Sequence, residues 1–150
     1  MTTVTAIQAL DLSKTSPRSC YATLGAFILL PRIIDKCRAA LAGTLGEYDS
    51  GCGLDMMFFN HFAINYDAFK AAVETGKTDE ELLAWVKANI VDPVDATDEA
   101  ILAWSYDARM YSPDSKEKKA YYETYRRTSA AHSNDVTTWF ALLEAEEQQA

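Results

Sequence analysis

The sequence predicts an all-α protein, a single compact bundle of about six to seven helices over residues 1–150. Apolar residues recur at spacings of three and four in one segment after another, which is typical of amphipathic helices. Residues that start or stop helices fall between these segments. No segment alternates apolar and polar residues in the manner of a strand.

The helix predicted over Leu30–Ala42 is the clearest element, and we expect the core to pack against it. Its apolar stripe consists of Leu30, Ile33, Ile34, Cys37 and Leu41. The charged residues that lie off this stripe are Arg32, Asp35, Lys36 and Arg38. Because Asp35 lies three residues from both arginines, we expect it to pair with each of them on the solvated surface. Gly43 and Gly46 supply the left-handed conformation that ends a helix.

The residues before this helix are expected to form an arm and one further helix. Residues 1–15 are rich in threonine and weakly patterned, so we predict an extended arm. Ser16 and Pro17 form a helix-start signal, since serine can cap a helix and proline suits its first position. The helix that follows is expected to bury Cys20, Leu24, Phe27 and Ile28. Pro31 should then break or kink the chain near Leu30.

Three helices are predicted in the middle of the chain. Gly46–Gly53 is dense in turn residues and is expected to form an irregular loop before an apolar helix over Leu54–Phe62. Asn65 should cap the next helix, which Gly76 ends. Thr78 and Glu81 form a capping box that opens a third helix, and Pro93 forces its end.

Three more helices are predicted toward the C-terminus. Thr97 begins the first, and Ser112-Pro113 begins a charged helix with Tyr121, Tyr122 and Tyr125. The last helix is expected to run from about Asn134 to Glu147. With Trp85 and Trp104, the three tyrosines could line an aromatic ligand pocket or a partner surface, or they could be core residues. They cannot all face one side of their helix, so at least one ring should lie near solvent.

Composition restricts the classes of function. The chain has 150 residues, 49% of them hydrophobic, and a formal net charge of −8, which argues against nucleic-acid binding. The longest apolar run is far too short to cross a membrane, and no signal peptide is evident. Three cysteines without C-x-x-C spacing describe neither a disulfide framework nor a zinc site. We therefore expect an acidic cytoplasmic protein with no metal site, and the sequence identifies no cofactor.

Several segments resemble a family of small bacterial proteins of unknown function, the domain numbered five-zero-six-nine in its series. The matching segments read SPR at 16–18, LPRIIDKCRAALAGTLGEY at 30–48, LD at 54–55, TDEELLAWV at 78–86 and DVTTWFALLEAEE at 135–147. The resemblance covers nearly the whole chain from Asp11 onward. It implies a small helical cytoplasmic domain and carries over no activity and no catalytic residue.

The charged residues of the central helix are the first candidate site. A basic pair such as Arg32 and Lys36, one turn apart, can bind a carboxylate or a phosphate. The alternative is structural: Asp35 would hold Arg32 and Arg38, and these would anchor the loop at Glu47 and Tyr48. Both interpretations stay open.

Cys52 and His61 are the other candidates. The glycines that flank Cys52 would let a substrate approach a reactive thiol, but neighbouring carboxylates disfavour the thiolate and we expect no basic group nearby to lower its pKa. The alternative is an inert thiol in a tight turn. His61, with Glu47 and Asp55, could complete a metal site, although no pair of ligands shares a helical face. The alternative is a histidine hydrogen-bonded at a helix end.

Two functions of different classes follow. The first is a non-enzymatic helical interaction module, a homo-oligomer or the binder of a protein partner, which uses the aromatic C-terminal helices. The second is a small-molecule (anion) binding protein or an enzyme, with a site between Arg32 and Lys36 and the loop Glu47–Asp55. No assembled catalytic constellation is evident in the sequence, so the first is favoured.

Overall fold

The structure is a computed structural model that describes residues 9–128 and 136–148. Seven α-helices and one two-stranded sheet lie in these two ranges. In chain order the elements are β1 (Thr23–Leu24), β2 (Phe27–Ile28), α1 (Leu30–Ala42), α2 (Gly53–Phe62), α3 (Tyr66–Glu74), α4 (Asp79–Asn89), the 3-10 helix η2 (Pro93–Ala96), α5 (Asp98–Arg109), α6 (Lys116–Thr128) and α7 (Trp139–Gln148). The predicted all-α class is confirmed.

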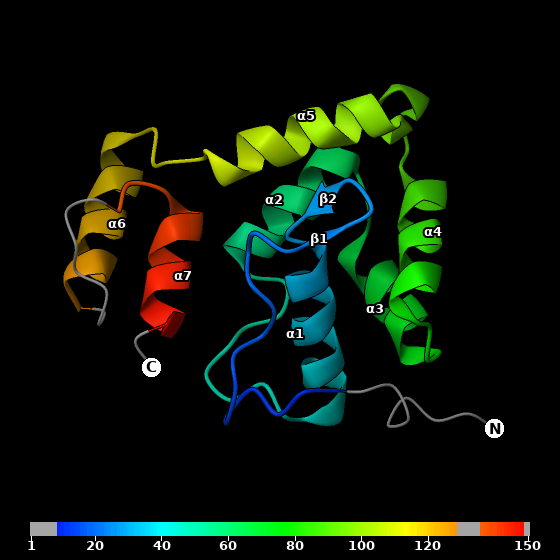
Figure 1. The fold of residues 1–150 in the computed structure, drawn as a ribbon, viewed down its shortest axis with the longest axis horizontal. Coiled ribbons are helices and arrows are strands. Elements are labelled where there is room, and N and C mark those ends of the chain that lie inside the picture. The colour runs from blue at the N-terminus through cyan, green and yellow to red at the C-terminus, as the bar shows by residue number, and fades with distance from the viewer. Residues whose placement is uncertain (1–8, 129–135, 149–150) are drawn as a thin grey trace.

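The elements form two groups. Figure 1 shows α1 near the middle, with α3 and α4 on one side, α6 and α7 on the other, and α5 crossing one end. We call β1, β2 and α1–α5 the helical body, and α6 with α7 the C-terminal helix pair. None of the described helices has the length and apolar character that a membrane span requires.

Helix α1 occupies the residues predicted for it and supports the core. Ile33, Ile34 and Cys37 are fully buried, so the predicted apolar stripe does face inward. Pro31 lies in the first turn, where its missing N–H leaves no helical hydrogen bond unmade. The predicted break near this proline is a left-handed residue at Leu29, with a φ of 76°.

Phenylalanine rings fill the core beside α1. The ring of Phe58 on α2 lies with its centroid 5.7 Å from that of Phe27 on β2 and 5.3 Å from that of Phe62. On the other side of α1, α3 buries Phe69 and α4 buries Leu82. Several elements that are far apart in sequence therefore share one apolar cluster.

The segment after Ser16 is not a helix, which corrects the prediction. Thr23 pairs with Ile28, and Leu24 with Phe27, in the short antiparallel sheet. Gly25 turns the chain between the strands at a φ of 58°. The backbone N–H of Arg18 donates to the Asp35 carboxylate instead of to a helical carbonyl. Tertiary hydrogen bonds thus override the capping signal, while Cys20, Phe27 and Ile28 are still buried.

The predicted extended arm is only partly open to test, because residues 1–8 lie outside the described residues. The described part is folded onto the body, which corrects the prediction there. Leu12 is buried, and its N–H donates to the carbonyl of Thr44 at 2.8 Å. Gly46 allows this close approach, since a Cβ on it would lie 2.9 Å from the carbonyl oxygen of Leu12.

Most predicted helix starts are confirmed, and two are displaced. Asn65 and Thr97 cap α3 and α5, and the capping box of Thr78 and Glu81 opens α4. Helix α6 starts at Lys116 instead of at Ser112-Pro113, because Ser115 accepts the N–H of Lys118 at 3.1 Å. Helix α7 starts at Trp139 after Thr138, and the predicted start at Asn134 lies outside the described residues.

The C-terminal helix pair has a small core of its own. The buried residues Tyr122 and Leu142 meet there, and the Trp139 ring lies 4.9 Å from the Tyr122 ring. Tyr121 is exposed, which confirms that the three tyrosines do not all face inward. Phe140 is fully buried in the main core and ties the pair to the body.

Candidate functional site

The charged face of α1 is buried, which corrects the expectation of a solvated network. The exposed fractions of its charged residues are 2% for Arg32, 5% for Asp35, 4% for Lys36 and 5% for Arg38. Asp35 does not pair with either arginine of its own helix. Each of the four charged side chains instead has a partner from another part of the chain. A buried charge requires such a partner, because leaving it unpaired costs several kcal/mol.

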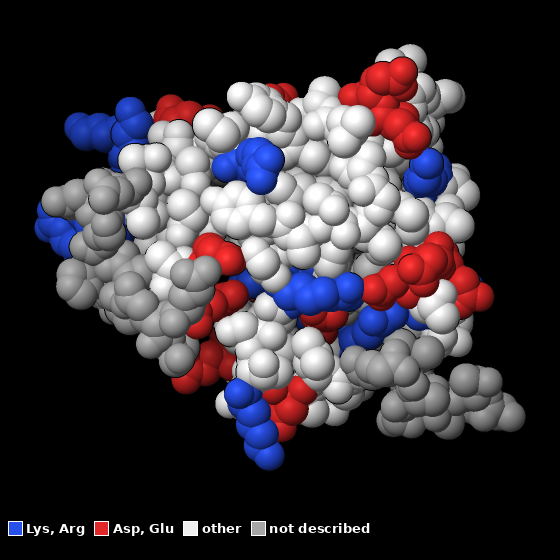
Figure 2. Space-filling model, in the orientation of Figure 1, with Lys and Arg blue, Asp and Glu red and all other residues white. Residues whose placement is uncertain are grey.

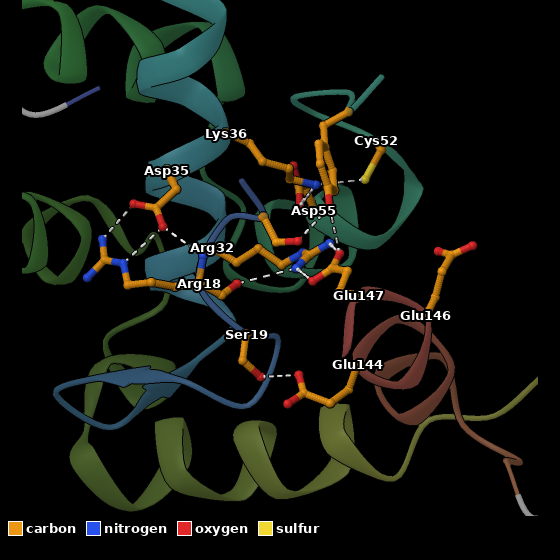
Figure 3. Close-up of polar contacts among 12 residues, drawn as sticks. Arg18, Ser19, Arg32, Asp35, Lys36, Cys52, Asp55, Glu144, Glu146 and Glu147 are labelled. Carbon is orange, nitrogen blue, oxygen red and sulfur yellow. Dashed lines mark hydrogen bonds and ion pairs between the residues drawn. The ribbon is translucent and has the colours of Figure 1, made fainter. Parts of the chain in front are cut away.

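Asp35 and Arg38 belong to a network on the side of α1 that faces α4. Asp35 accepts three hydrogen bonds from Arg18, from its backbone N–H and from its guanidinium (Figure 3). Asp79, at the start of α4, lies 2.8 Å from the guanidinium of Arg18 and 3.0 Å from that of Arg38. This network joins the N-terminal segment to α1 and α4, and it lies away from the cavity described below.

Arg32 reaches the opposite side and joins α1 to α7. Its guanidinium donates two hydrogen bonds to the Glu147 carboxylate, at 3.0 and 2.6 Å (Figure 3). The Tyr48 hydroxyl donates to the same carboxylate at 3.2 Å, and the Arg32 cation lies 5.6 Å from the centre of the Tyr48 ring. Burial raises the pKa of Tyr48, although its hydrogen bond to Ser16 opposes this, so the phenol stays protonated at neutral pH.

Lys36, one turn further on, contacts both Asp55 and Cys52 (Figure 3). Its Nζ lies 3.0 Å from Asp55 Oδ1 and 3.3 Å from Cys52 Sγ. The other carboxylate oxygen of Asp55 accepts the N–H of Gly51 at 3.0 Å. The expectation that no basic group lies near Cys52 is therefore wrong, since this ammonium approaches it from another element.

Burial separates Cys52 from the other two thiols. Cys52 is partly exposed, whereas Cys20 and Cys37 are buried. Burial raises the pKa of Cys20 and of Cys37 to about 11, so both are protonated and inert at neutral pH.

A cavity of about 1010 Å³ lies between the helical body and the C-terminal helix pair. On the side of the body it is lined by Arg32, Lys36, Tyr48, Cys52, Gly53 and Met57. On the side of the helix pair it is lined by Tyr121, Tyr125, Trp139, Leu143, Glu146 and Glu147. The Arg32–Glu147 ion pair joins the two sides. The volume is that of a small-molecule site.

The structure brings together only part of the predicted site. Arg32, Lys36, Glu47, Tyr48 and Cys52 line the cavity, and Asp55 holds Lys36 from behind. Asp35 and Arg38 face α4 instead, as described above, and do not line it.

His61 lies apart from this cavity. It is exposed at the end of α2, with its ring 4.7 Å from that of Phe62. Asp55, its proposed co-ligand, is fully buried beside Lys36. Within the described ranges, no three or more His, Cys, Asp and Glu side chains are grouped so that they could hold a metal ion.

The sequence analysis did not connect the aromatic side of the cavity with the charged residues of α1. The sequence analysis offered Tyr121 and Tyr125 for a ligand pocket or a partner surface, but nothing in the sequence joined them, or Trp139, to the cavity wall of α1. The Tyr125 hydroxyl donates to Glu146 at 3.0 Å. Burial, followed by this hydrogen bond and the Glu146 charge, raises the pKa of Tyr125 to about 12. The phenol is therefore a fixed donor at neutral pH.

Comparison with known proteins identifies the family of the chain. Residues 14–149 match the family described as Domain of unknown function (DUF5069), and the chain belongs to this family. A search of curated proteins gives no match. The family covers both sides of the cavity.

Proposed function

We propose that the protein binds a small molecule in the cavity between the helical body and the C-terminal helix pair. The observation that carries the proposal is the convergence of a buried polar helix face and an aromatic helix pair on one cavity of about 1010 Å³. The lining is mixed: apolar and aromatic surface from Met57, Leu143 and Trp139, and a few polar groups held in place by hydrogen bonds. This composition is typical of ligand sites.

The buried ion pairs on the cavity side of α1 support a role for this face in binding, since they contribute little to stability. Buried ion pairs are often no more stabilising than apolar residues of the same size, because both charges lose their water. Arg32 and Lys36 each carry such a pair at the cavity wall. A role in arranging the cavity would explain why charged side chains occupy positions that aliphatic ones could fill.

A cavity-filling variant tests the proposal. Gly53 lines the cavity at the start of α2, and a Cβ on it would have no neighbour within 4 Å. Gly53→Phe should therefore occupy the cavity without disturbing its wall. The matched control is Ala88→Phe, which adds the same ring on the exposed surface of α4.

Three probes that share one scaffold serve as ligands: phenylacetate, benzyl alcohol and benzyltrimethylammonium. Binding is measured by calorimetry and by the shift of the thermal unfolding midpoint. We expect at least one probe to bind the wild type and Ala88→Phe, and to lose binding in Gly53→Phe. Absence of binding by all three at millimolar concentration, or equal binding by Gly53→Phe, would contradict the proposal.

An exposed apolar stripe on α5 favours a second candidate, self-association of the chain. Leu102, Tyr106 and Met110 are exposed and lie four residues apart, so they share one face. Glu99 stands near the start of this helix and Arg109 near its end. Two copies of α5 in antiparallel contact would thus place opposite charges beside each other.

Light scattering after size exclusion tests this second candidate. We expect a dimer for the wild type and a monomer for Tyr106→Glu, which places a charge on the stripe. Tyr121→Glu, an equally exposed tyrosine outside α5, is the control and should stay dimeric. A monomeric wild type at concentrations up to about 100 μM would contradict it.

A further inference from the structure

We propose that the ligand of this cavity is a small organic cation that carries an aromatic or apolar group. The inference rests on the proposed binding function and adds the charge of the ligand. It reverses the sequence-based expectation of an anion, because of how the charges around the cavity are already paired.

Each basic side chain of the cavity wall already has a carboxylate partner. The guanidinium of Arg32 holds Glu147 in a two-bond pair with distances of 3.0 and 2.6 Å. Lys36 holds Asp55 at 3.0 Å, and both side chains are almost fully buried. Lys118, the third basic residue of the lining, lies 3.2 Å from Asp114. An anionic ligand would have to displace a buried carboxylate from Arg32 or from Lys36, whereas Lys118 and Asp114 form an exposed pair at the edge of the cavity.

The acidic side chains of the lining are less occupied. The lining carboxylates are Glu47, Asp49, Glu117, Glu146 and Glu147. In the described part of the chain, only Glu147 of these five forms an ion pair. The lining thus has three cations, all paired, and four carboxylates without a basic partner among the described residues. The charge left over for a ligand to neutralise is negative.

Glu146 is the best placed of these carboxylates. It lies on α7 within the cavity lining, and the Tyr125 hydroxyl orients it with a hydrogen bond of 3.0 Å. Figure 3 shows its side chain directed away from the Arg32–Glu147 pair. It is therefore free to meet a cationic group that enters between the helix pair and the body.

Aromatic rings complete the recognition. Tyr121, Tyr125 and Trp139 lie on the same side of the cavity as Glu146, and the Trp139 ring is 5.6 Å from that of Tyr125. The faces of such rings attract cations, tryptophan most strongly. The protein already uses this attraction at the cavity, since Lys118 lies 6.0 Å from the centre of the Tyr111 ring and Arg32 lies over Tyr48. An alkylammonium group with an aromatic substituent would match both features.

The three probes of matched size test the inference directly. Benzyltrimethylammonium should bind the wild type at least about ten-fold more tightly than phenylacetate, because cation–π contact and a nearby carboxylate both favour it. Glu146→Gln keeps an acceptor for Tyr125 and removes the charge. This variant should weaken the binding of benzyltrimethylammonium about three- to ten-fold and leave the binding of benzyl alcohol unchanged. Glu80→Gln, on the exposed surface of α4, is the control for general attraction to an acidic protein.

The outcomes separate this inference from the function on which it rests. Phenylacetate or benzyl alcohol could bind as tightly as benzyltrimethylammonium or more tightly, and Gly53→Phe could block this binding. That result would overturn the inference of a cationic ligand but leave the proposed binding function intact. Cation binding that Gly53→Phe does not reduce, or that Glu146→Gln and Glu80→Gln reduce alike, would also overturn it. Failure of all three probes to bind would remove the binding function as well.

Discussion

The helical body and the C-terminal helix pair are held together by different interactions. The body buries phenylalanines from β2, α2 and α3 around α1, with aromatic centroids about 5 to 6 Å apart. The helix pair has a small apolar core and meets the body through Phe140, through Ser19 with Glu144, and through Arg32 with Glu147. The cavity lies along this polar contact. The body should therefore determine whether the chain folds, and the contact should determine whether the cavity is closed.

The surface charge of the molecule is mixed and does not divide the helical body from the C-terminal helix pair. Figure 2 shows acidic and basic side chains intermixed across one face of the molecule, with no continuous basic area on it. The charges at the cavity come from both regions, Arg32 and Lys36 from α1 and Glu146 and Glu147 from α7. The two regions should therefore differ in how they respond to changes in the phenylalanine core, in the buried ion pairs and in the carboxylate network at α4.

The largest effect is expected in the phenylalanine core. Phe58 is fully buried and contacts the rings of Phe27, Phe62 and Trp104. Phe58→Ala should cost about 3–5 kcal/mol of unfolding free energy, measured by urea denaturation, because it leaves a cavity in the core. Tyr122→Ala, in the helix pair, is the matched truncation. Equal losses for the two variants would contradict the distinction between the regions.

The buried pair of Lys36 and Asp55 should give the next largest effect. Asp55→Leu leaves the Lys36 ammonium buried without its partner and should cost about 3 kcal/mol. The double variant Lys36→Met with Asp55→Leu replaces both charges with apolar groups and should recover most of that loss. Urea denaturation of the two single variants and the double variant measures the coupling. A double variant no more stable than Asp55→Leu would show that the pair is not the cause.

A smaller and local effect is expected at the contact between the regions. Glu147→Gln removes the negative charge that pairs with Arg32. The free energy of opening of the C-terminal helix pair should therefore fall by about 1–3 kcal/mol. Hydrogen exchange should show faster exchange in α6 and α7 and little change in α1. Glu123→Gln alters an ion pair with Arg126 that lies within α6 and has an exposed carboxylate, so it should leave exchange nearly unchanged. Faster exchange throughout the body would contradict the account.

The smallest effect concerns pH and the network at α4. Burial would raise the pKa of Asp79, but its hydrogen bonds with Arg18 and Arg38 and their charges outweigh burial and lower it. A carboxyl group with a lowered pKa stabilises the fold above its unfolded pKa, and this contribution is lost as the pH falls through the folded pKa. Asp79→Asn removes the carboxylate partner of the buried Arg38 but keeps an amide oxygen as acceptor, so it should cost about 1–2 kcal/mol at neutral pH, and this cost should shrink as the pH falls through the folded pKa of Asp79. A loss independent of pH would contradict this.

The elements of the body could be predicted from the sequence because their signals are local. The stripe of Ile33, Ile34 and Cys37 recurs at helical spacing, and Thr78 with Glu81 marks a helix start within four residues. The helix predicted after Ser16 does not form, because a long-range hydrogen bond outweighs the local signal there. There the backbone of Arg18 bonds to Asp35, which lies 17 residues away, and no local pattern reports such a bond.

The cavity could be predicted only on one side. Arg32, Lys36, Tyr48 and Cys52 belong to one stretch of sequence, and their convergence was expected. The partners of the charged residues were not, since Glu147 lies 115 residues from Arg32 and spacing within a helix favours nearby pairs. The charged face of α1 can be buried because these distant partners neutralise it. Spacing within the helix does not reveal such partners, so the sequence analysis placed this face at the surface.

Nuclear magnetic resonance of the tryptophan indole groups can show whether a ligand enters the cavity. The chain has three tryptophans, and of these only Trp139 lines the cavity, while Trp104 is in the core and Trp85 packs at its edge. On titration with benzyltrimethylammonium, we expect the indole N–H signal of Trp139 to shift while those of Trp85 and Trp104 stay in place. An unmoved Trp139 signal at saturating probe, or equal shifts of all three, would contradict a ligand cavity between the body and the helix pair.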